Sequence, residues 1–330
     1  MTADRVEALE ADILGGPRAL TDLLDAYSAP DGPLAGAGDR PSRVVLTGLG
    51  SSLYAASTAA AHLRGSGLPA WAEYASTGVP TATADDLTLV AVSASGRTRE
   101  VIEAARRHRG HGRVIAITND LDSRLAREAD HVLPLLAGRE GAGIATRTFR
   151  ATIAVLGLLA GRWLGGNSTA ETLRRAVEPL RAALDGRDTW LMAAADRLDG
   201  AAAIDVIGDA ADAALVRQAA LMLREAPRLP ATAHDTGDWL HTAVYLALPG
   251  HRAVLFSGAA ADDEAVSAIG RRGGETIVVG EPVPGAAQVI PLPIAAESGL
   301  LERAIVGSVI AELLALELWR RTTAQEVPAP

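Results

Sequence analysis

The sequence predicts an α/β protein made of two tandem units, each with a mostly parallel, doubly wound sheet flanked by helices. Strand-like apolar runs alternate with helical patterns in the first half of the 330 residues, as doubly wound folds require. The same order starts again near residue 201. Hydrophobic residues make up 48% of the chain and aromatic residues only 3%, so the cores must be Ala, Val, Leu and Ile, which suits helices on a parallel sheet.

The first half predicts an N-terminal segment followed by one five-stranded unit. Residues 1–40 are expected to form a helix over 5–27, broken at Gly15-Gly16-Pro17, and a lead-in. The first unit is expected over residues 41–165. Its strands are predicted at 43–47, 69–74, 87–92, 113–118 and 131–135. Helical patterns follow the first, third and fourth strands, and a long helix at 145–164 closes the unit.

The second half predicts a connector and a second unit of the same kind. Residues 166–200 are expected to be a helical connector, with apolar residues at helical spacing over 168–198. The second unit is expected over residues 201–330. Its strands are predicted at 203–208, 228–233, 253–257, 275–279 and 288–292. Its helices are predicted at 212–225, 236–246, 261–271 and 299–320.

The composition excludes several classes of function. The chain has no cysteine, which excludes disulfides, thiolate metal ligands and cysteine nucleophiles. All 31 basic residues are arginine, which excludes a P-loop lysine and Schiff-base chemistry. The formal net charge of −9 argues against nucleic acid as a partner. No His, Asp and Glu cluster has metal-binding spacing, so we expect neither a metal nor another cofactor.

No segment predicts export or a membrane partner. The first residues carry acidic side chains and no long apolar run, unlike a secretory signal. The apolar stretch at 153–161 lies between Arg150 and Arg162 and is too short to span a bilayer. We therefore expect a cytoplasmic protein.

Two loops rich in hydroxyl side chains follow two of the predicted strands. Gly48–Ser52 comes after the strand at 43–47, and Ser93–Thr98 comes after the strand at 87–92. Because parallel strands end at one edge of the sheet, the two loops are expected to converge on one ligand. Helix N-termini and hydroxyls bind anions, although an ordinary helix cap uses the same residue types. A dinucleotide is disfavoured because the first loop lacks the third glycine of G-x-G-x-x-G.

These loops resemble those of the paired sugar isomerase (SIS) domains found in glucosamine-6-phosphate synthase and in stand-alone amino-sugar-phosphate deaminases and isomerases. The resemblance covers nearly the whole chain from about residue 40 and implies two tandem SIS domains. In that family the S-x-S-G-x-T loop and the earlier loop hold the sugar phosphate. The residues implied as phosphate ligands are Ser51, Ser52, Ser93, Ser95 and Thr98. The stretch Gly143–Thr146 also resembles the family's G-V-A-S segment, which implies that the sugar is lined by Ile144, Ala145 and Thr146.

Two further matches in the second unit imply catalytic residues. Leu223-Arg224-Glu225 resembles the family's L-K-E, whose glutamate is the base. Gly237–His241 resembles G-E-L-K-H, whose histidine assists ring opening, often in the partner subunit's site. The resemblance thus implies that Glu225 moves a proton between C1 and C2 and that His241 acts at the ring oxygen. From the residue types alone, a solvated carboxylate and a capped or core histidine compete with these roles.

The resemblance implies a homodimeric enzyme that processes a sugar phosphate. The expected reaction begins with removal of the C2 proton of an amino-hexose 6-phosphate and gives isomerisation with deamination. The alternatives are a dehydratase or lyase acting on N-acetylglucosamine 6-phosphate, an isomerase of another anionic hexose, and a non-catalytic sugar-phosphate-binding regulator. Synthesis from glutamine is not expected, because the chain has neither the synthase's tail lysine nor a cysteine for a glutaminase unit.

Overall fold

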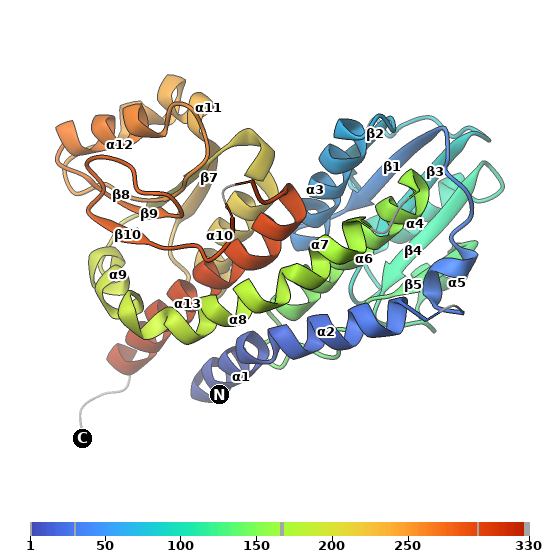
Figure 1. Ribbon diagram of the computed structural model, residues 1–330, viewed down its shortest axis with the longest axis horizontal. Helices are drawn as coiled ribbons and strands as arrows, with labels where there is room; N and C mark the ends of the chain where they lie inside the picture. The colour runs from blue at the N-terminus through green and yellow to red at the C-terminus, as the bar shows by residue number, and fades with distance from the viewer. Residues whose placement is uncertain (1, 30, 166–167, 296, 327–330) are drawn as a thin grey trace.

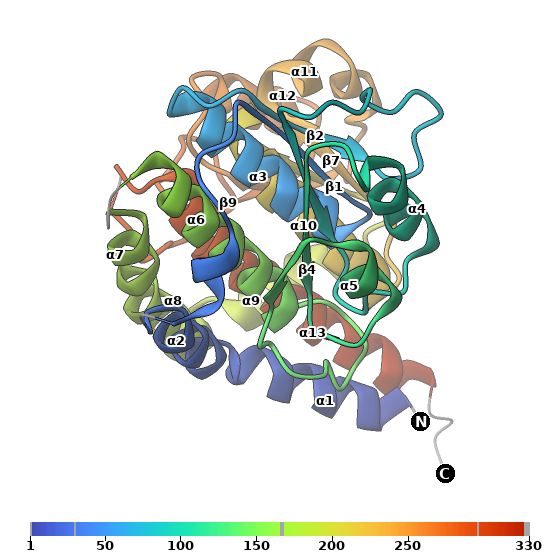
Figure 2. The same cartoon turned by 90° about the vertical axis from the view of Figure 1, so that its right-hand side faces the viewer.

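A computed structural model describes residues 2–29, 31–165, 168–295 and 297–326 (Figure 1). Two parallel five-stranded sheets, one in each half of the chain, lie on either side of a layer of helices (Figures 1 and 2). Further helices cover the outer faces. The predicted α/β class with two doubly wound sheets is confirmed.

The first sheet has the strand order β2-β1-β3-β4-β5, and every pairing is parallel. Its strands are β1 (Arg43–Gly48), β2 (Ala70–Tyr74), β3 (Leu87–Val92), β4 (Arg113–Thr118) and β5 (His131–Pro134). All residues of the central β3 are buried, because helices cover both faces of the sheet. This double burial explains why the strand is a continuous apolar run in the sequence.

The second sheet repeats this topology, with the order β10-β9-β8-β6-β7 and parallel pairing throughout. Its strands are β6 (Ile204–Gly208), β7 (Ala231–Asp235), β8 (Arg252–Phe256), β9 (Glu275–Val279) and β10 (Gln288–Ile290). The strand predicted at 228–233 begins later, at Ala231. Arg228, with a φ of 59°, turns the chain there, and the Leu229 N–H donates back to the Leu223 carbonyl at 3.0 Å.

The helices follow the predicted order, with shorter pieces in two places. The helices outside those two places are α1 (Thr2–Leu14), α2 (Gly16–Tyr27), α3 (Ser51–Gly65), α4 (Arg99–His108), α5 (Arg124–Glu128), α6 (Arg147–Leu164), α10 (Ala213–Glu225), α12 (Asp262–Arg271) and α13 (Leu300–Glu326). The connector is broken into α7 (Ser168–Arg175), α8 (Val177–Asp185) and α9 (Leu191–Leu198). The helix expected over 236–246 ends early, as α11 (Thr236–His241) followed by a 3-10 turn, η4 (Ala243–Leu246). None of the described helices is long and apolar enough to cross a membrane.

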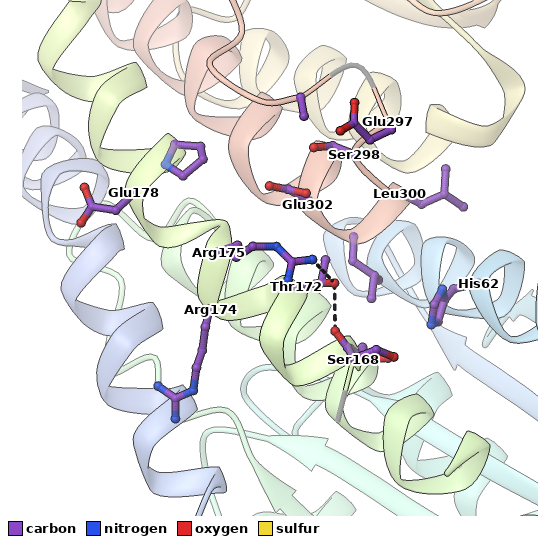
Figure 3. Close-up of a pocket in the computed structure, with 15 residues that line it drawn as sticks. His62, Ser168, Thr172, Arg174, Arg175, Glu178, Glu297, Ser298, Leu300 and Glu302 are labelled. Carbon is purple, nitrogen blue, oxygen red and sulfur yellow. Dashed lines mark hydrogen bonds between the residues drawn. The ribbon is translucent and has the colours of Figure 1, made fainter. Parts of the chain in front are cut away.

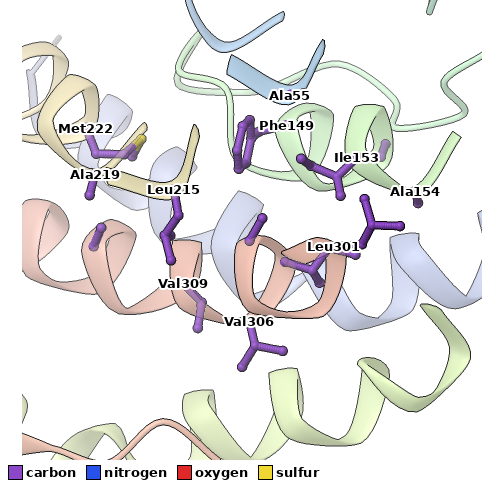
Figure 4. Close-up of a cluster of buried hydrophobic side chains, with 14 of the residues drawn as sticks. Ala55, Phe149, Ile153, Ala154, Leu215, Ala219, Met222, Leu301, Val306 and Val309 are labelled. Atoms are coloured by element: carbon purple, nitrogen blue, oxygen red, sulfur yellow. The ribbon is translucent and has the colours of Figure 1, made fainter. Parts of the chain in front are cut away.

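Four helices form the layer between the sheets. Helices α3 and α6 of the first half pack on each other and on α10 and α13 of the second half. Figure 4 shows side chains from all four meeting in one apolar cluster, among them Ala55, Phe149, Leu215 and Val309. The same cluster reaches both sheets, through Val90 and Val206 for example. The two halves therefore share a single hydrophobic core.

A buried ion pair crosses this layer. Arg150 of α6 is 1% exposed and Glu312 of α13 is 0% exposed. Arg150 Nη1 lies 2.6 Å from both carboxylate oxygens of Glu312. The other two guanidinium nitrogens have no hydrogen-bond partner among the described residues. Removal of one charge would leave the other buried without compensation, whereas removal of both would leave an apolar contact.

We therefore expect Glu312→Gln to destabilise the fold by about 3–5 kcal/mol, because it strands the Arg150 charge. The double variant Arg150→Met/Glu312→Leu should recover most of this loss, since both charges leave the core together. Glu103→Gln, which breaks an exposed pair with Arg99, is the control and should change stability little because water screens that pair. Urea unfolding measures all three. A double variant less stable than Glu312→Gln would contradict this account.

Candidate functional site

The two hydroxyl-rich loops stand side by side where the strand order of the first sheet reverses. Strand β1 lies between β2 and β3, so the chain leaves β1 toward one side through α3 and returns on the other side at β3. Thr47 pairs with Ala91 just before the two loops begin. In open α/β sheets, ligands bind in the crevice at this position. We call this place the first crevice, between Gly48–Ser52 and Ser93–Thr98.

The loop Gly48–Ser52 opens α3 without covering its first N–H groups. Gly50 precedes the helix with a φ of 53° and, within the described part of the chain, no side chain caps this N-terminus. A Cβ atom at Gly50 would meet nothing within 4 Å, so the space in front of the helix is open. Ser51 and Ser52 are half-buried in the first turn. The loop thus offers free amides, two hydroxyls and the positive end of a helix dipole to an anion.

The loop Ser93–Thr98 is held in shape by its own hydroxyls. Ser93 Oγ lies 2.9 Å from Thr98 Oγ1, so Thr98 does not cap α4 although it occupies the N-cap position. Gly96 has a φ of 61°, and a Cβ there would collide with Ser123 Oγ. Ser95 is exposed at the rim. Like α3, α4 therefore begins without a side-chain cap among the described residues, although its first turn also carries Glu100.

The segment implied to line the sugar is largely covered by protein. Ile144 and Thr146 are buried, and Ala145 is half-buried. The Glu140 carboxylate accepts hydrogen bonds from the N–H groups of Thr146 and Thr148 at 3.0 and 2.7 Å, and from Thr146 Oγ1 at 3.1 Å. Glu140 thus occupies the N-terminus of α6 as an internal anion. Sequence reasoning missed it; its only signal is an acidic residue shortly before a predicted helix.

The equivalent crevice of the second sheet is filled by another internal carboxylate. Asp262 accepts from the N–H groups of Gly258 and Ala259 at 2.8 and 2.9 Å and from Thr236 Oγ1 at 2.9 Å. The loop after β8 corresponds in topology to Ser93–Thr98, so its anion position is already taken. In the first crevice, by contrast, no carboxylate among the described residues is hydrogen-bonded to the amides of the two loops or of the helix starts, although Glu100 lies in the first turn of α4.

Glu225 ends α10, and the packing of α10 directs it toward the first crevice. Arg303 at the start of α13 bonds Asp212 at the start of α10, and the start of α13 shares a cavity with His62 near the end of α3. Helices α10 and α3 also pack together, so they run antiparallel. Glu225, at the C-terminal end of α10, therefore lies toward the N-terminal end of α3, where Ser51 is.

The electrostatic environment of Glu225 suits a base. Loss of water around the carboxyl raises its pKa above the ordinary 4.5, with the Arg224 charge opposing that effect, although the residue as a whole is exposed. Midway along α10, Gln218 Nε2 donates to the Ala145 carbonyl at 3.0 Å and ties this helix to the segment before α6. No hydrogen bond joins Glu225 to either loop among the described residues.

His241 lies apart from these groups within the chain. It is exposed at the end of α11, and α11 packs on β6, β7, α12 and η4 of the second half. Three exposed large apolar side chains follow it closely, Tyr245, Leu246 and Leu248. The structure thus does not bring His241 to the first crevice of the same molecule.

Two cavities lie near these elements. One, of about 910 Å³, adjoins the second loop and is lined in part by Ser95, Arg97 and Asn119, which suits a polar ligand. The other, of about 780 Å³, lies between α3, α7 and α13, where His62, Arg175 and Glu302 line it (Figure 3). It sits near the end of α3, opposite to Ser51, and so does not belong to the first crevice. No group of three His, Asp or Glu residues could hold a metal ion in the described ranges.

Comparison with known families identifies the first half. Residues 39–162 match the family described as "SIS domain". These residues, which hold the first sheet, form a SIS domain. The match contains both loops of the first crevice and the segment Gly143–Thr146. The second sheet repeats the topology of this SIS domain but lies outside the matched residues.

The relatives and solved structures extend the similarity beyond the SIS domain. The chain is 34% identical over 260 residues to a glutamine–fructose-6-phosphate aminotransferase [isomerizing] of Aeropyrum pernix; the match covers 73% of this chain and 42% of the relative, so it spans less than half of that protein. The C-terminal domain of glucosamine-fructose-6-phosphate aminotransferase from Francisella tularensis superposes with a TM-score of 0.81, at 19% identity and 98% coverage of both chains. A glucosamine-6-phosphate deaminase of Thermotoga maritima gives a TM-score of 0.73 at 17% identity, covering 96% of this chain and 95% of that one. These solved structures show that the fold is shared over both halves.

The raised pKa of Glu225 makes stability depend on pH. Folding favours the protonated form of the Glu225 carboxyl. The contribution of this group to the stability of the folded protein is therefore complete below the ordinary pKa of 4.5, and it is lost as pH rises through the pKa that the group has in the folded protein. Glu225→Gln removes this titration. We expect the variant to gain stability relative to the wild type as pH rises from roughly 4 to 8. Denaturant unfolding at several pH values measures the difference, and a difference that does not vary with pH would contradict the shift.

Proposed function

We propose that the protein is a phosphosugar isomerase of the SIS type that removes the C2 proton of a hexose 6-phosphate bound in the first crevice. The observation that carries the proposal is the pair of helix N-termini, α3 and α4, that meet at the switch point without a side-chain cap. The corresponding anion positions at α6 and in the second sheet hold Glu140 and Asp262. Among the described residues, no carboxylate is bonded to the N-termini of α3 and α4 in this way, so the position is open to a bound phosphate.

The phosphate ligands proposed are the side chains and amides of the two loops, at Ser51, Ser52, Ser93, Ser95 and Thr98. Ser93 and Thr98 hold each other at 2.9 Å, which preorganises both hydroxyls before the ligand arrives. Ser95 and Arg97 continue the polar surface into the adjoining cavity. The sugar would extend from the phosphate toward the backbone of Gly143–Thr146, where Ile144, Ala145 and Thr146 supply packing rather than free polar side chains.

Glu225 is proposed as the base. A carboxyl group with a raised pKa holds a proton more strongly, which makes it a better acceptor for a carbon-bound proton. Its helix points toward Ser51, so a sugar anchored by phosphate at α3 would extend within its reach. The proton taken from C2 returns at C1, which converts an aldose into a ketose. With a 2-amino sugar, the ketose imine that results is hydrolysed and ammonia leaves.

His241 is proposed to act at the ring oxygen of a sugar bound by a second copy of this chain. It is exposed and separated from the first crevice of its own molecule. The adjacent Tyr245, Leu246 and Leu248 expose apolar surface, which a homodimer contact would cover. A homodimer would thus complete each site with a histidine from the partner subunit.

Deamination of glucosamine 6-phosphate is the specific reaction proposed. The relative from Aeropyrum pernix is named as an isomerizing aminotransferase of glutamine and fructose 6-phosphate, and the Thermotoga maritima structure is named as a glucosamine-6-phosphate deaminase. The second candidate is dehydration of N-acetylglucosamine 6-phosphate, which uses the same C2 proton but expels the C3 hydroxyl. The solved structures also include a tagatose-6-phosphate ketose/aldose isomerase from Escherichia coli, with a TM-score of 0.75, so a ketose phosphate without an amino group is a further substrate to test.

Phosphate recognition is tested by ligand-induced stabilisation. Glucosamine 6-phosphate at about 100 times its Kd should stabilise the wild type by roughly 2.7 kcal/mol, and glucosamine without phosphate should not. Thr98→Val removes one hydroxyl and should abolish most of the effect. Thr232→Val, at an exposed position of β7, is the matched control and should respond like the wild type. An unchanged response in Thr98→Val would contradict the assignment of the loop.

Turnover tests the base and the outcome together. Glucosamine 6-phosphate should release ammonia and fructose 6-phosphate, and Glu225→Gln should lower kcat by about 10²- to 10⁴-fold, as expected for loss of a positioned base. Glu264→Gln, an exposed carboxylate of α12, should leave turnover intact. With N-acetylglucosamine 6-phosphate as the substrate, an unsaturated product without ammonia would select the dehydratase. Unchanged turnover in Glu225→Gln would reject Glu225 as the base.

A further inference from the structure

The helix that carries His241 cannot hold its own position. Helix α11 has only six residues, far below the length at which an isolated helix is stable in water. Its orientation must come from contacts with the rest of the second half. Three side-chain bonds supply them. Asp235 Oδ1 accepts from the Asp238 N–H at 2.9 Å, Thr236 Oγ1 bonds Asp262 Oδ1 at 2.9 Å, and the Trp239 indole Nε1 donates to Asp205 Oδ2 at 2.7 Å.

The third bond differs from the first two because it holds the middle of the helix rather than its start. Trp239 is 0% exposed and is packed among Ile207, Leu255 and Val278 of the second sheet. Asp205 is the second residue of β6, two positions before Ile207, so its side chain leaves the sheet on the face that α11 covers. The bond thus joins the buried face of α11 to a central strand.

Asp205 is a strong anchor because ring nitrogens surround its carboxylate. His234 Nε2 lies 3.4 Å from Oδ1 and His251 Nε2 lies 3.2 Å from Oδ2. Burial opposes ionisation of this carboxyl, but the two histidines and the Trp239 indole outweigh burial and hold its pKa well below the usual range. The acceptor is therefore an ionised oxygen, and hydrogen bonds to charged acceptors are the stronger class.

Helical geometry converts this anchor into a direction for His241. Successive residues are rotated by about 100° around a helix, so residues two apart lie on nearly opposite faces. With Trp239 held inward on Asp205, His241 must point outward, and it is indeed exposed. The G-E-L-K-H motif that Gly237–His241 resembles has leucine where this chain has Trp239. The leucine side chain has no N–H, so the side-chain bond to Asp205 is not part of that motif.

We propose that Asp205 is a positioning residue which, through its bond to the Trp239 indole, fixes the rotation of α11 and so aims His241 away from its own subunit. The inference rests on the proposed function, because it assigns the aim of His241 in that reaction. Trp239 and Asp205 touch neither substrate nor reacting atoms. Their loss should therefore act on the step that His241 assists and leave phosphate binding by the two loops intact.

Trp239→Phe tests this, because it keeps an aromatic ring in the core and removes the indole N–H. We expect kcat on glucosamine 6-phosphate to fall by about 10- to 100-fold, the effect of misplacing a catalytic group by about an ångström, with KM within twofold. The kcat of Asp205→Asn should also fall. Trp190→Phe, at a buried tryptophan outside α11, is the matched control and should keep the wild-type kcat.

A double variant separates positioning from general damage. In a His241→Gln background, Trp239→Phe should lower kcat no further, because the group that it positions is already absent. An equal additional loss in that background would overturn the proposal, and so would a wild-type kcat in Trp239→Phe.

A final measurement does not depend on turnover. Backbone amide exchange at Leu240–Thr242 should be faster in Trp239→Phe than in the wild type or Trp190→Phe, with exchange in β6 unchanged. Equal exchange in the three proteins would overturn the anchoring role. A wild type that turns over no sugar phosphate would instead reject the proposed function and leave the exchange result standing, so the two failures are distinguishable.

Discussion

The packing of α3 and α6 against α10 and α13 is the constraint on which the rest of the structure depends. Each sheet needs helices on both faces to bury its apolar strands. Here α3 packs on the first sheet and α10 on the second, and these two helices form one layer with α6 and α13 between the sheets. The Arg150–Glu312 pair lies inside this layer. Any arrangement that separated the two side chains would leave buried charges without compensation and would be less stable. The orientation of α10 against α3 is therefore fixed by core packing, and Glu225 is positioned as a consequence of it.

Duplicated topology and different chemistry explain why only one crevice is proposed to bind an anion. Both sheets have the same strand order, so both create a crevice where that order reverses. In the second, the Asp262 carboxylate satisfies the loop amides and also anchors Thr236 at the start of α11. The second crevice thus positions a helix, whereas the first stays open. One duplicated fold supports a ligand in one copy and an internal anchor in the other.

The sequence predicted the strands and the convergence of the two loops well, because both depend on local patterns: continuous apolar runs, followed by small hydroxyl residues. It predicted β7 too early, because the turn at Arg228 depends on a backbone conformation that residue type does not reveal. It also missed Glu140, Asp262 and Asp205, whose partners are other backbone amides or side chains brought near by folding. The roles proposed for Glu225 and His241 came from resemblance. The geometry adds the orientation of α10, which ends at Glu225, and the exposure of His241.

The central claim, that a sugar phosphate held in the first crevice loses its C2 proton to Glu225, is tested most directly by hydrogen exchange at carbon. Wild-type protein incubated with glucosamine 6-phosphate or fructose 6-phosphate in D₂O should introduce deuterium at the exchanging carbon, as followed by proton NMR of the sugar. Proton removal from carbon is the first step of isomerisation, deamination and dehydration alike, and the base exchanges the proton that it has taken with D₂O, so the signal does not depend on the final product. We expect exchange with the wild type and its loss in Glu225→Gln and Thr98→Val; exchange at the wild-type rate in Glu225→Gln would contradict this claim.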